Sequence, residues 1–195
     1  MSNPIENLKS ECLDCRKCGL GGCIQNGKPA NVFSNMNVDA RVMVVGRSPG
    51  HSEIEEDEPF AGRSGKFFKE ALADMCGIDE SKLYFTNTVK CFIPDDRKPR
   101  QKEMDACRHF LDSEIAIIKP AIIVALGAQA FKSLTGMSRV SKHYGELTYS
   151  VKYCVHVLPL PNPSPQNTNN PERLEILLSG LRELREFYKG YKHGG

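Results

Sequence analysis

The sequence predicts an α/β protein, a three-layer α/β/α sandwich around a central, mostly parallel four-stranded sheet. Four short runs rich in β-branched and other apolar residues indicate buried strands, at residues 41–46, 83–89, 121–127 and 152–161. Segments with the apolar spacing of helices lie between and after these runs. Such alternation favours right-handed crossovers and a parallel sheet with helices on both faces.

A predicted helix follows each predicted strand. These helices cover residues 65–77, 100–118, 128–134 and 171–191. Pro171 suits the first turn of the last helix, and Gly77 suits the end of the first. About forty residues before the first strand, rich in Cys, Gly and Asn, predict an irregular appendage. Because no linker or repeat divides the chain, we expect a single domain over residues 1–195, with this appendage tied to it.

The bulk composition sets limits without naming a partner. The 195 residues have a formal net charge of +2 and 40% hydrophobic residues, as in an ordinary globular protein. Phosphate binding depends on where Lys and Arg cluster, so this charge neither requires nor excludes nucleic acid. No apolar run approaches the ~20 residues that span a bilayer. We therefore expect a cytoplasmic monomer without a membrane partner.

The cysteines predict a metal site. Four fall within twelve residues near the N-terminus and two follow in the middle of the chain: Cys12, Cys15, Cys18, Cys23, Cys91 and Cys107. Without a signal peptide they favour metal ligation over disulfides. A local pair with two remote thiols would tie the appendage to the sheet, but the N-terminal four could also bind zinc alone, in a structural adaptor. The remaining two, Cys76 and Cys154, lie in apolar runs and are interpreted as core residues.

Several strings occur in an order that resembles a known family. They are CRKCGL, VMVVGRSPG, EPFAGRSGKFF, FTNTVKC, ACRHFL, IIVALG and NPSPQN, from about Cys15 to about Leu178. The chain resembles the uracil-DNA glycosylase superfamily, in particular its iron-sulfur branches, families 4 and 5. The resemblance implies a monofunctional hydrolase that removes uracil, with other deaminated bases, from DNA in base excision repair, inside the cell at the nucleoid.

The same resemblance implies a metal cofactor and its ligands. A structural [4Fe-4S] cluster would be held by Cys15, Cys18, Cys91 and Cys107. Zinc stays the alternative metal.

Two residues match the base-binding positions of this family. Phe60 matches the phenylalanine that stacks on the flipped base, and Asn87 matches the asparagine that reads its edge. Taken singly, Phe60 could be a core side chain and Asn87 a turn residue. Their joint placement at one sheet edge, with Gly46, Pro49 and Gly50 nearby, favours a substrate-binding site.

The loop after the last predicted strand corresponds to the second signature loop. Asn162 stands where most families have histidine, and its amide can donate to the uracil anion as a catalytic group. By resemblance Ser164 contacts a phosphate, and Gln166 and Asn167 lie against the DNA minor groove.

The first signature loop departs from the family pattern. Arg47 replaces the acid that is usual in family 4, and Ser48 replaces the catalytic aspartate of the classical family. His51 and Glu53 are the nearest groups able to act as a base. Arg47 could stabilise the leaving group, bind a DNA phosphate, or pair with Glu53 or Glu55. The second hypothesis is therefore a non-catalytic or re-purposed member that binds damaged or modified DNA.

Basic residues are expected to contact DNA near these loops. Arg63 and Lys66 lie at the start of the first predicted helix, whose N-terminus attracts anions. The larger predicted patch comprises Lys66, Lys90, Arg97, Lys98, Arg100 and Lys102. An ordinary solvated loop is the alternative for residues 97–102.

Overall fold

The computed structural model describes residues 3–193 and has a central five-stranded sheet. Its strands are β3 (Val42–Gly46), β4 (Leu83–Asn87), β5 (Ile122–Leu126), β6 (Thr148–Ser150) and β7 (Val155–Leu160), in the order β4-β3-β5-β7-β6. The four predicted strands are parallel, and β6 adds an antiparallel edge. The predicted α/β sandwich is confirmed. The sequence missed β6 because its three residues form no apolar run.

The structure has seven α-helices within the described residues, and the four predicted ones agree with it to within one or two residues at each end. They are α1 (Pro4–Leu13), α2 (His51–Glu56), α3 (Arg63–Ala71), α4 (Gln101–Ile118), α5 (Gly127–Thr135), α6 (Pro165–Thr168) and α7 (Pro171–His193). Helix α3 continues into a π-helical turn at Leu72–Cys76. Short 3-10 turns occur at Glu80–Lys82, Pro94–Asp96 and Val140–Lys142. The predicted helices correspond to α3 with its π-helical turn, α4, α5 and α7, whereas α1, α2 and α6 were not predicted.

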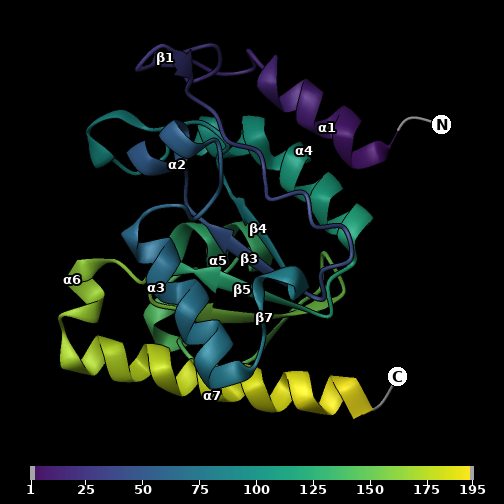
Figure 1. Ribbon diagram of the computed structural model, residues 1–195, viewed down its shortest axis with the longest axis vertical. Coiled ribbons are helices and arrows are strands. Elements are labelled where there is room, and N and C mark those ends of the chain that lie inside the picture. The colour runs from purple at the N-terminus through teal and green to yellow at the C-terminus, as the bar shows by residue number, and fades with distance from the viewer. Residues whose placement is uncertain (1–2, 194–195) are drawn as a thin grey trace.

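Both faces of the sheet are buried, which produces the three layers in Figure 1. Alternate residues of a strand point to opposite faces. Met43 packs on the side of α4 and α5, whereas Val44 packs on the side of α3 and α7. Because both faces of the sheet are covered, the strand sequences are continuous apolar runs. Each fully buried Leu or Phe side chain contributes about 1.5–3 kcal/mol to the free energy of folding.

The N-terminal appendage is not wholly irregular, and that prediction was wrong for α1. Asn3 caps the helix by accepting a hydrogen bond from the Ile5 amide at 3.3 Å, and Pro4 occupies its first turn. Ile5 and Leu8 are buried in the cluster that also contains α4 residues. The Asn-Pro start was a usable signal, but the Cys- and Gly-rich segment that follows the helix led the whole appendage to be taken as irregular.

The rest of the appendage lies against the loops that follow β4 and β3. Val32 donates to the Lys90 carbonyl at 2.8 Å, and Phe92 donates to the Ala30 carbonyl at 2.7 Å. A two-strand hairpin, β1 (Ile24–Gln25) with β2 (Lys28–Pro29), lies above α2 in Figure 1. The Lys28 ammonium donates to the Glu55 carbonyl of α2. Backbone pairing therefore joins the appendage to the edge of the sheet that carries the candidate site.

The two cysteines expected in the core have different environments. Cys76 is buried and donates to the Leu181 carbonyl at 3.2 Å, as predicted for a core thiol. Cys154 is exposed, and its interpretation as a core residue was wrong. It ends the tight turn between β6 and β7 with a φ of 52°, a left-handed conformation that the preceding apolar letters did not reveal.

The carboxyl ends of the parallel strands meet at one edge of the sheet. Gly46 pairs with Asn87, and Leu126 pairs with Leu160. Ligands of open parallel sheets bind at this edge. Among the described helices, none is long and apolar enough to cross a membrane.

Candidate functional site

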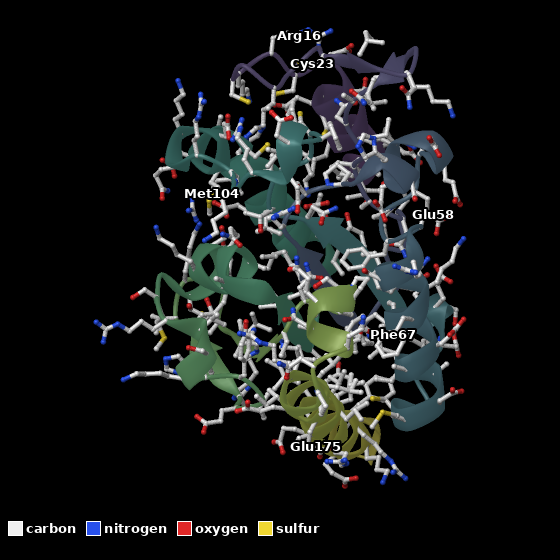
Figure 2. The ribbon with its side chains drawn as sticks, turned by 90° about the vertical axis from the view of Figure 1, so that its left-hand side faces the viewer. Arg16, Cys23, Glu58, Phe67, Met104 and Glu175 are labelled. Atoms are coloured by element: carbon white, nitrogen blue, oxygen red, sulfur yellow. The ribbon has the colours of Figure 1, made fainter. Side chains whose placement is uncertain are left out.

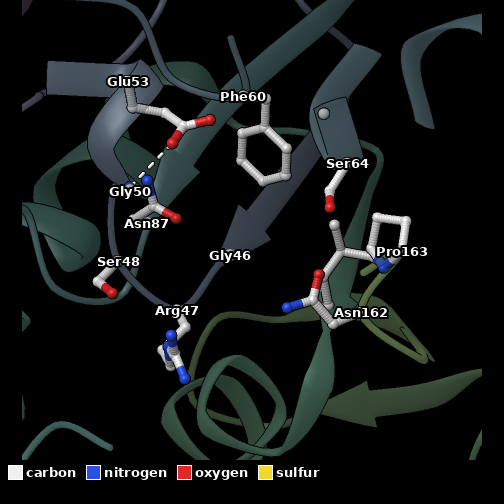
Figure 3. A pocket seen from close by; sticks show the side chains of 12 residues that line it. Gly46, Arg47, Ser48, Gly50, Glu53, Phe60, Ser64, Asn87, Asn162 and Pro163 are labelled. Atoms are coloured by element: carbon white, nitrogen blue, oxygen red, sulfur yellow. Dashed lines mark hydrogen bonds between the residues drawn. The ribbon is translucent and has the colours of Figure 1, made fainter. Parts of the chain in front are cut away.

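A cavity of about 180 Å³ opens at the carboxyl edge of the sheet (Figure 3). It is lined by Gly46, Arg47, Ser48, Gly50, Glu53, Phe60, Ser64, Gly65, Asn87, Leu126, Asn162 and Pro163. Pockets for drug-sized ligands usually measure ≈ 300–1,000 Å³. This cavity therefore suits a single small ring, and it brings together residues from three loops that the sequence assigned to a site.

Gly46 lets two side chains approach the end of β3. A methyl group added there would lie 2.4 Å from the Asn87 Oδ1 atom and 3.0 Å from the Phe60 Cζ atom. Any residue larger than glycine would push Asn87 or Phe60 out of position. Glycine at position 46 is thus required for the cavity.

Phe60 lies in the cavity wall with an uncommon backbone conformation. Its φ is 60°, in the left-handed region that an aromatic residue rarely adopts. Its ring packs on Phe85, with centroids 5.1 Å apart and planes tilted by 43°. Gly65 permits the fold of this loop, since a methyl group there would lie 2.1 Å from the Phe60 carbonyl oxygen. The surrounding fold therefore fixes an aromatic ring at the cavity.

The Asn87 side chain presents its carboxamide group to the cavity. The residue is only 3% exposed, yet its side chain lines the cavity. Within residues 3–193 no hydrogen bond involves the side-chain amide of Asn87. The backbone carbonyl of Asn87 accepts one from the Lys90 ammonium at 2.9 Å. A carboxamide can both accept and donate, so it is suited to reading one edge of a planar base.

Lys90 does not belong to a basic surface patch, and that prediction was wrong. Its side chain is 1% exposed and its ammonium lies 2.5 Å from the carboxylate of Glu114, which is fully buried. Lys90 also donates to the Thr86 hydroxyl at 2.5 Å. The ammonium thus braces the turn that carries Asn87. Its position in a polar loop gave no sign of burial, because the partner lies in α4.

Glu53 holds two loops together at the cavity. Its carboxylate accepts from the Gly50 amide at 2.9 Å and from the Gly62 amide at 2.8 Å. Ser48 also lines the cavity, while Pro49 is buried next to it in the chain. His51 is exposed and packs on Phe92, with ring centroids 4.6 Å apart, outside the cavity lining. Glu53 therefore has a clear positional role, and His51 does not line the cavity.

Arg47 forms an ion pair with Asp96 rather than with Glu53 or Glu55. An ion pair with Glu53 or Glu55 was one of three roles considered for Arg47, and neither glutamate is its partner. Asp96 follows Asp95 in a turn where both residues have positive φ, 58° and 47°. Arg47 and Asp96 are 49 residues apart in the sequence, and their contact depends on this turn. The residues around Arg47 therefore could not predict its partner.

Asn162 and the loop that follows it form the opposite wall (Figure 3). The Asn162 carbonyl accepts from the Asn167 side-chain amide at 2.7 Å, and the Ser164 carbonyl accepts from the Asn167 backbone amide at 2.8 Å. The Asn167 Oδ1 atom also accepts from Arg173 at 3.3 Å. Asn167 thus stabilises the loop, while Gln166 is exposed; their contacts with DNA, and that of Ser164, stay predictions.

Most of the predicted DNA-contacting cations lie outside the cavity. Arg63 and Lys66 are exposed on α3 and line a neighbouring shallow groove, where Lys66 lies 3.9 Å from Glu56. Arg97 donates to both carboxylate oxygens of Glu103, at 2.8 and 2.9 Å. The remaining members of the predicted patch, Lys98, Arg100 and Lys102, are exposed.

Four lining residues were predicted neither as substrate contacts nor as catalytic groups. They are Ser64, Gly65, Leu126 and Pro163. Leu126 had a usable signal, because it ends the third predicted strand and the same edge rule applies to it. Ser64 and Gly65 belong to the start of α3, where the sequence predicted anion binding rather than contact with a base.

The four cysteines implied as cluster ligands share one neighbourhood. Cys91 and Cys107 are buried, and Cys15 and Cys18 pack against the same hydrophobic cluster. Burial raises the pKa of the Cys91 thiol, and the nearby thiols of Cys107, Cys12, Cys18 and Cys15 raise it further. Figure 2 shows the end of the molecule where this segment lies, marked by Arg16 and Cys23.

Within the described part of the chain, no three His, Cys, Asp or Glu residues form a group that could hold one metal ion. The other two N-terminal cysteines differ from each other in their surroundings. Burial raises the pKa of Cys12 to about 12, whereas Cys23 is exposed.

The cavity can bind one planar polar ring. Phe60 supplies an aromatic face, Asn87 an amide edge and Asn162 a second amide on the opposite wall. Within the described residues, no lysine lines the cavity, so the lining offers no amine nucleophile. Fold and site together define an α/β protein with a base-sized pocket at the carboxyl edge of its sheet.

Comparison with known proteins gives the family. The family model for the uracil DNA glycosylase superfamily matches residues 33–186. A type-4 uracil-DNA glycosylase of Sulfurisphaera tokodaii is 31% identical over 191 residues, covering 93% of this chain and 84% of the relative. One of Thermotoga maritima is 42% identical over 110 residues, 56% of this chain and 57% of the relative. A type-5 enzyme of Pyrobaculum aerophilum is 28% identical, covering 80% and 75%. The chain belongs to the uracil DNA glycosylase superfamily.

Proposed function

We propose that this protein is a monofunctional uracil-DNA glycosylase of base excision repair, with other deaminated bases as lesser substrates. The observation that carries the proposal is the joint placement of Phe60 and Asn87 around Gly46 in a cavity that holds one ring. The type-4 enzymes that the chain resembles over 93% of its length support it. DNA is the proposed partner.

Substrate binding follows from the two walls of the cavity. A target nucleotide leaves the base stack at a cost of a few kcal/mol and its base enters the pocket. Phe60 stacks on the ring, and the Asn87 amide accepts from N3-H and donates to O4 of uracil. Cytosine has an acceptor at N3 and a donor at its 4-amino group, the reverse of uracil. The acceptor of the buried Asn87 amide would then face an acceptor and its donor a donor, so cytosine is rejected.

Bond cleavage depends on stabilising the leaving group. Water forms the new bond to C1′, the bond from C1′ to N1 breaks, and uracil leaves with the electron pair as an anion. The proton that the water loses is taken up by the released uracil anion. Asn162 donates to O2 of this anion, and one such donor can contribute about 3 kcal/mol. The Glu53 carboxylate accepts hydrogen bonds from the backbone amides of Gly50 and Gly62. We therefore assign Glu53 to orienting the loop near the water rather than to strong base catalysis.

We propose that Cys15, Cys18, Cys91 and Cys107 hold a [4Fe-4S] cluster. When bound, the cluster would supply a structural cross-link rather than redox chemistry. It would connect the appendage to the loop after β4, which backbone hydrogen bonds already join at Val32 and Phe92. The spread of the four thiols in one buried neighbourhood supports this assignment.

The competing candidate is a member that binds damaged or modified DNA without cleaving it. Its motivation is the replacement of the usual acid by Arg47, together with the engagement of both Glu53 oxygens. It predicts tight binding to uracil-containing DNA and no release of the base.

Uracil release decides between these functions. Iron-loaded protein is incubated in excess over single-stranded and double-stranded oligonucleotides containing uracil, hypoxanthine, xanthine or a thymine mismatch, across a range of pH. We expect uracil to be released fastest, leaving an abasic site without strand cleavage until alkali is added. Binding without release from any strand would support the competing candidate and reject the glycosylase.

A further inference from the structure

An ion pair at the lip of the cavity joins Arg47 to Asp96. Arg47 is partly exposed, with 30% of its side chain accessible, whereas Asp96 is 87% exposed. Figure 3 shows the Arg47 side chain directed away from Phe60, toward the outside of the cavity. The guanidinium therefore lies at the entrance and not at the end where the base is proposed to bind.

Position and charge make the guanidinium a suitable phosphate ligand. The Arg47 carbonyl accepts from the Val89 amide at 3.0 Å, so its backbone is fixed next to the turn that carries Asn87. A base bound between Phe60 and Asn87 keeps its own sugar and phosphates at the entrance, because the cavity holds only one ring. Arginine binds phosphate through two parallel hydrogen bonds, which are stronger than neutral ones.

Asp96 is an exchangeable partner for this arginine. A carboxylate that is 87% exposed gains little from an ion pair, because water solvates it well and salt screens the attraction. A DNA phosphate offers the same charge and better geometry, and Asp96 can return to water at low cost. The neighbouring exposed cations at Lys98 and Arg100 would draw the strand to this entrance.

We propose that Arg47 binds a backbone phosphate beside the flipped nucleotide, and that Asp96 holds its guanidinium until DNA displaces the carboxylate. This rests on the proposed function for the identity of the ligand. It assigns the residue that departs from the type-4 pattern to recognition of the strand rather than to the leaving group.

The test measures equilibrium binding to a single-stranded oligonucleotide with an uncleavable abasic analogue at the target position. Affinity is followed from 50 to 300 mM salt, roughly, for the iron-loaded wild type, Arg47→Gln, Asp96→Asn and the double variant. Loss of one phosphate contact should reduce the slope of log K against log salt by about 0.7 in Arg47→Gln. Asp96→Asn should tighten low-salt binding by about two- to fivefold, and this gain should vanish in the Arg47→Gln background.

Asp95→Asn is the matched control, since it removes the same charge from the adjacent residue of the same turn. Its effect should be smaller and equal with Arg47 or Gln at position 47. An unchanged salt slope in Arg47→Gln, or an Asp96→Asn gain that persists without Arg47, overturns the proposal. So does a slower single-turnover release in Arg47→Gln with an unaltered slope, which would place the guanidinium on the base. Because the ligand is uncleavable, the binding result stands whether or not uracil release is observed.

Discussion

Replacing Lys90 by Met tests the buried ion pair beneath the base site. The Lys90 ammonium donates to the Glu114 carboxylate at 2.5 Å, with both side chains almost inaccessible. Glu114 also accepts from the Tyr84 hydroxyl at 3.1 Å and from the Thr86 hydroxyl at 2.8 Å. Methionine fills similar space without charge, so Lys90→Met leaves a carboxylate stranded in the core.

The expected loss of stability is large. Removing one partner of a buried ion pair costs about 3–5 kcal/mol of unfolding free energy. That raises the unfolded fraction roughly a hundred- to several thousandfold. For a chain of this length it lowers the melting temperature by about 6–20 °C.

The destabilisation should also depend on pH. Burial raises the pKa of Glu114, and Lys90 and the two hydroxyls oppose this shift. In Lys90→Met the pKa of Glu114 in the folded state rises further above its unfolded value. A proton then relieves the stranded charge, so the penalty is absent below the unfolded pKa and grows as pH rises toward the folded pKa. We expect a smaller loss at pH 5.5 than at pH 8, roughly.

Urea unfolding followed by circular dichroism, under anaerobic conditions, measures this loss. Lys90→Met/Glu114→Gln is the companion variant, because its amide oxygen still accepts from Tyr84 and Thr86 and no charge is stranded. It should recover most of the stability. Lys189→Met removes an exposed lysine paired with Glu186 and should leave the unfolding midpoint unchanged. A loss below about 1 kcal/mol in Lys90→Met would show that the pair is hydrated and the reasoning wrong.

Three further variants test the cavity and the cysteine site. Gly46→Ala places a methyl group 2.4 Å from the Asn87 Oδ1 atom and should slow single-turnover uracil release by about 10²-fold, with DNA affinity retained; an unaffected rate would contradict the described cavity. Gly65→Ala meets the Phe60 carbonyl at 2.1 Å and should lower the unfolding free energy by about 1–3 kcal/mol in urea titrations; wild-type stability would argue against that backbone approach. Cys107→Ser should reduce bound iron and visible absorbance, whereas Cys23→Ser, at an exposed thiol, should keep both; equal iron in the two variants would reject the ligand assignment.

The site residues that could be predicted from the sequence lie at the carboxyl ends of the parallel strands. The first predicted strand ends at Gly46, and Asn87 lies near the end of the second, predicted at residues 83–89. Parallel strands place their carboxyl ends together, so the cavity residues of these loops follow from chain order. Phe60 was assigned by resemblance. Its left-handed backbone depends on the close approach of Gly65, which only the folded loop shows.

The features that escaped prediction depend on distant partners or on short elements. Lys90 reads as a surface cation until Glu114, 24 residues later, is seen to face it across the core. Arg47 finds Asp96 through a turn with two positive φ values, a conformation that no apolar period encodes. The six-residue helix α2 is too short for its period to be distinguished from a loop.

The central claim is that Asn87 reads a base held by Phe60 in this cavity. Its most direct test compares single-turnover uracil release by Asn87→Ala and by the wild type at saturating enzyme, with iron content and affinity for the abasic analogue matched. Losing the contacts assigned to N3-H and O4 of uracil should slow release by about 10²-fold. A rate for Asn87→Ala within about threefold of the wild type, a change of less than ~1 kcal/mol in barrier, would contradict the claim.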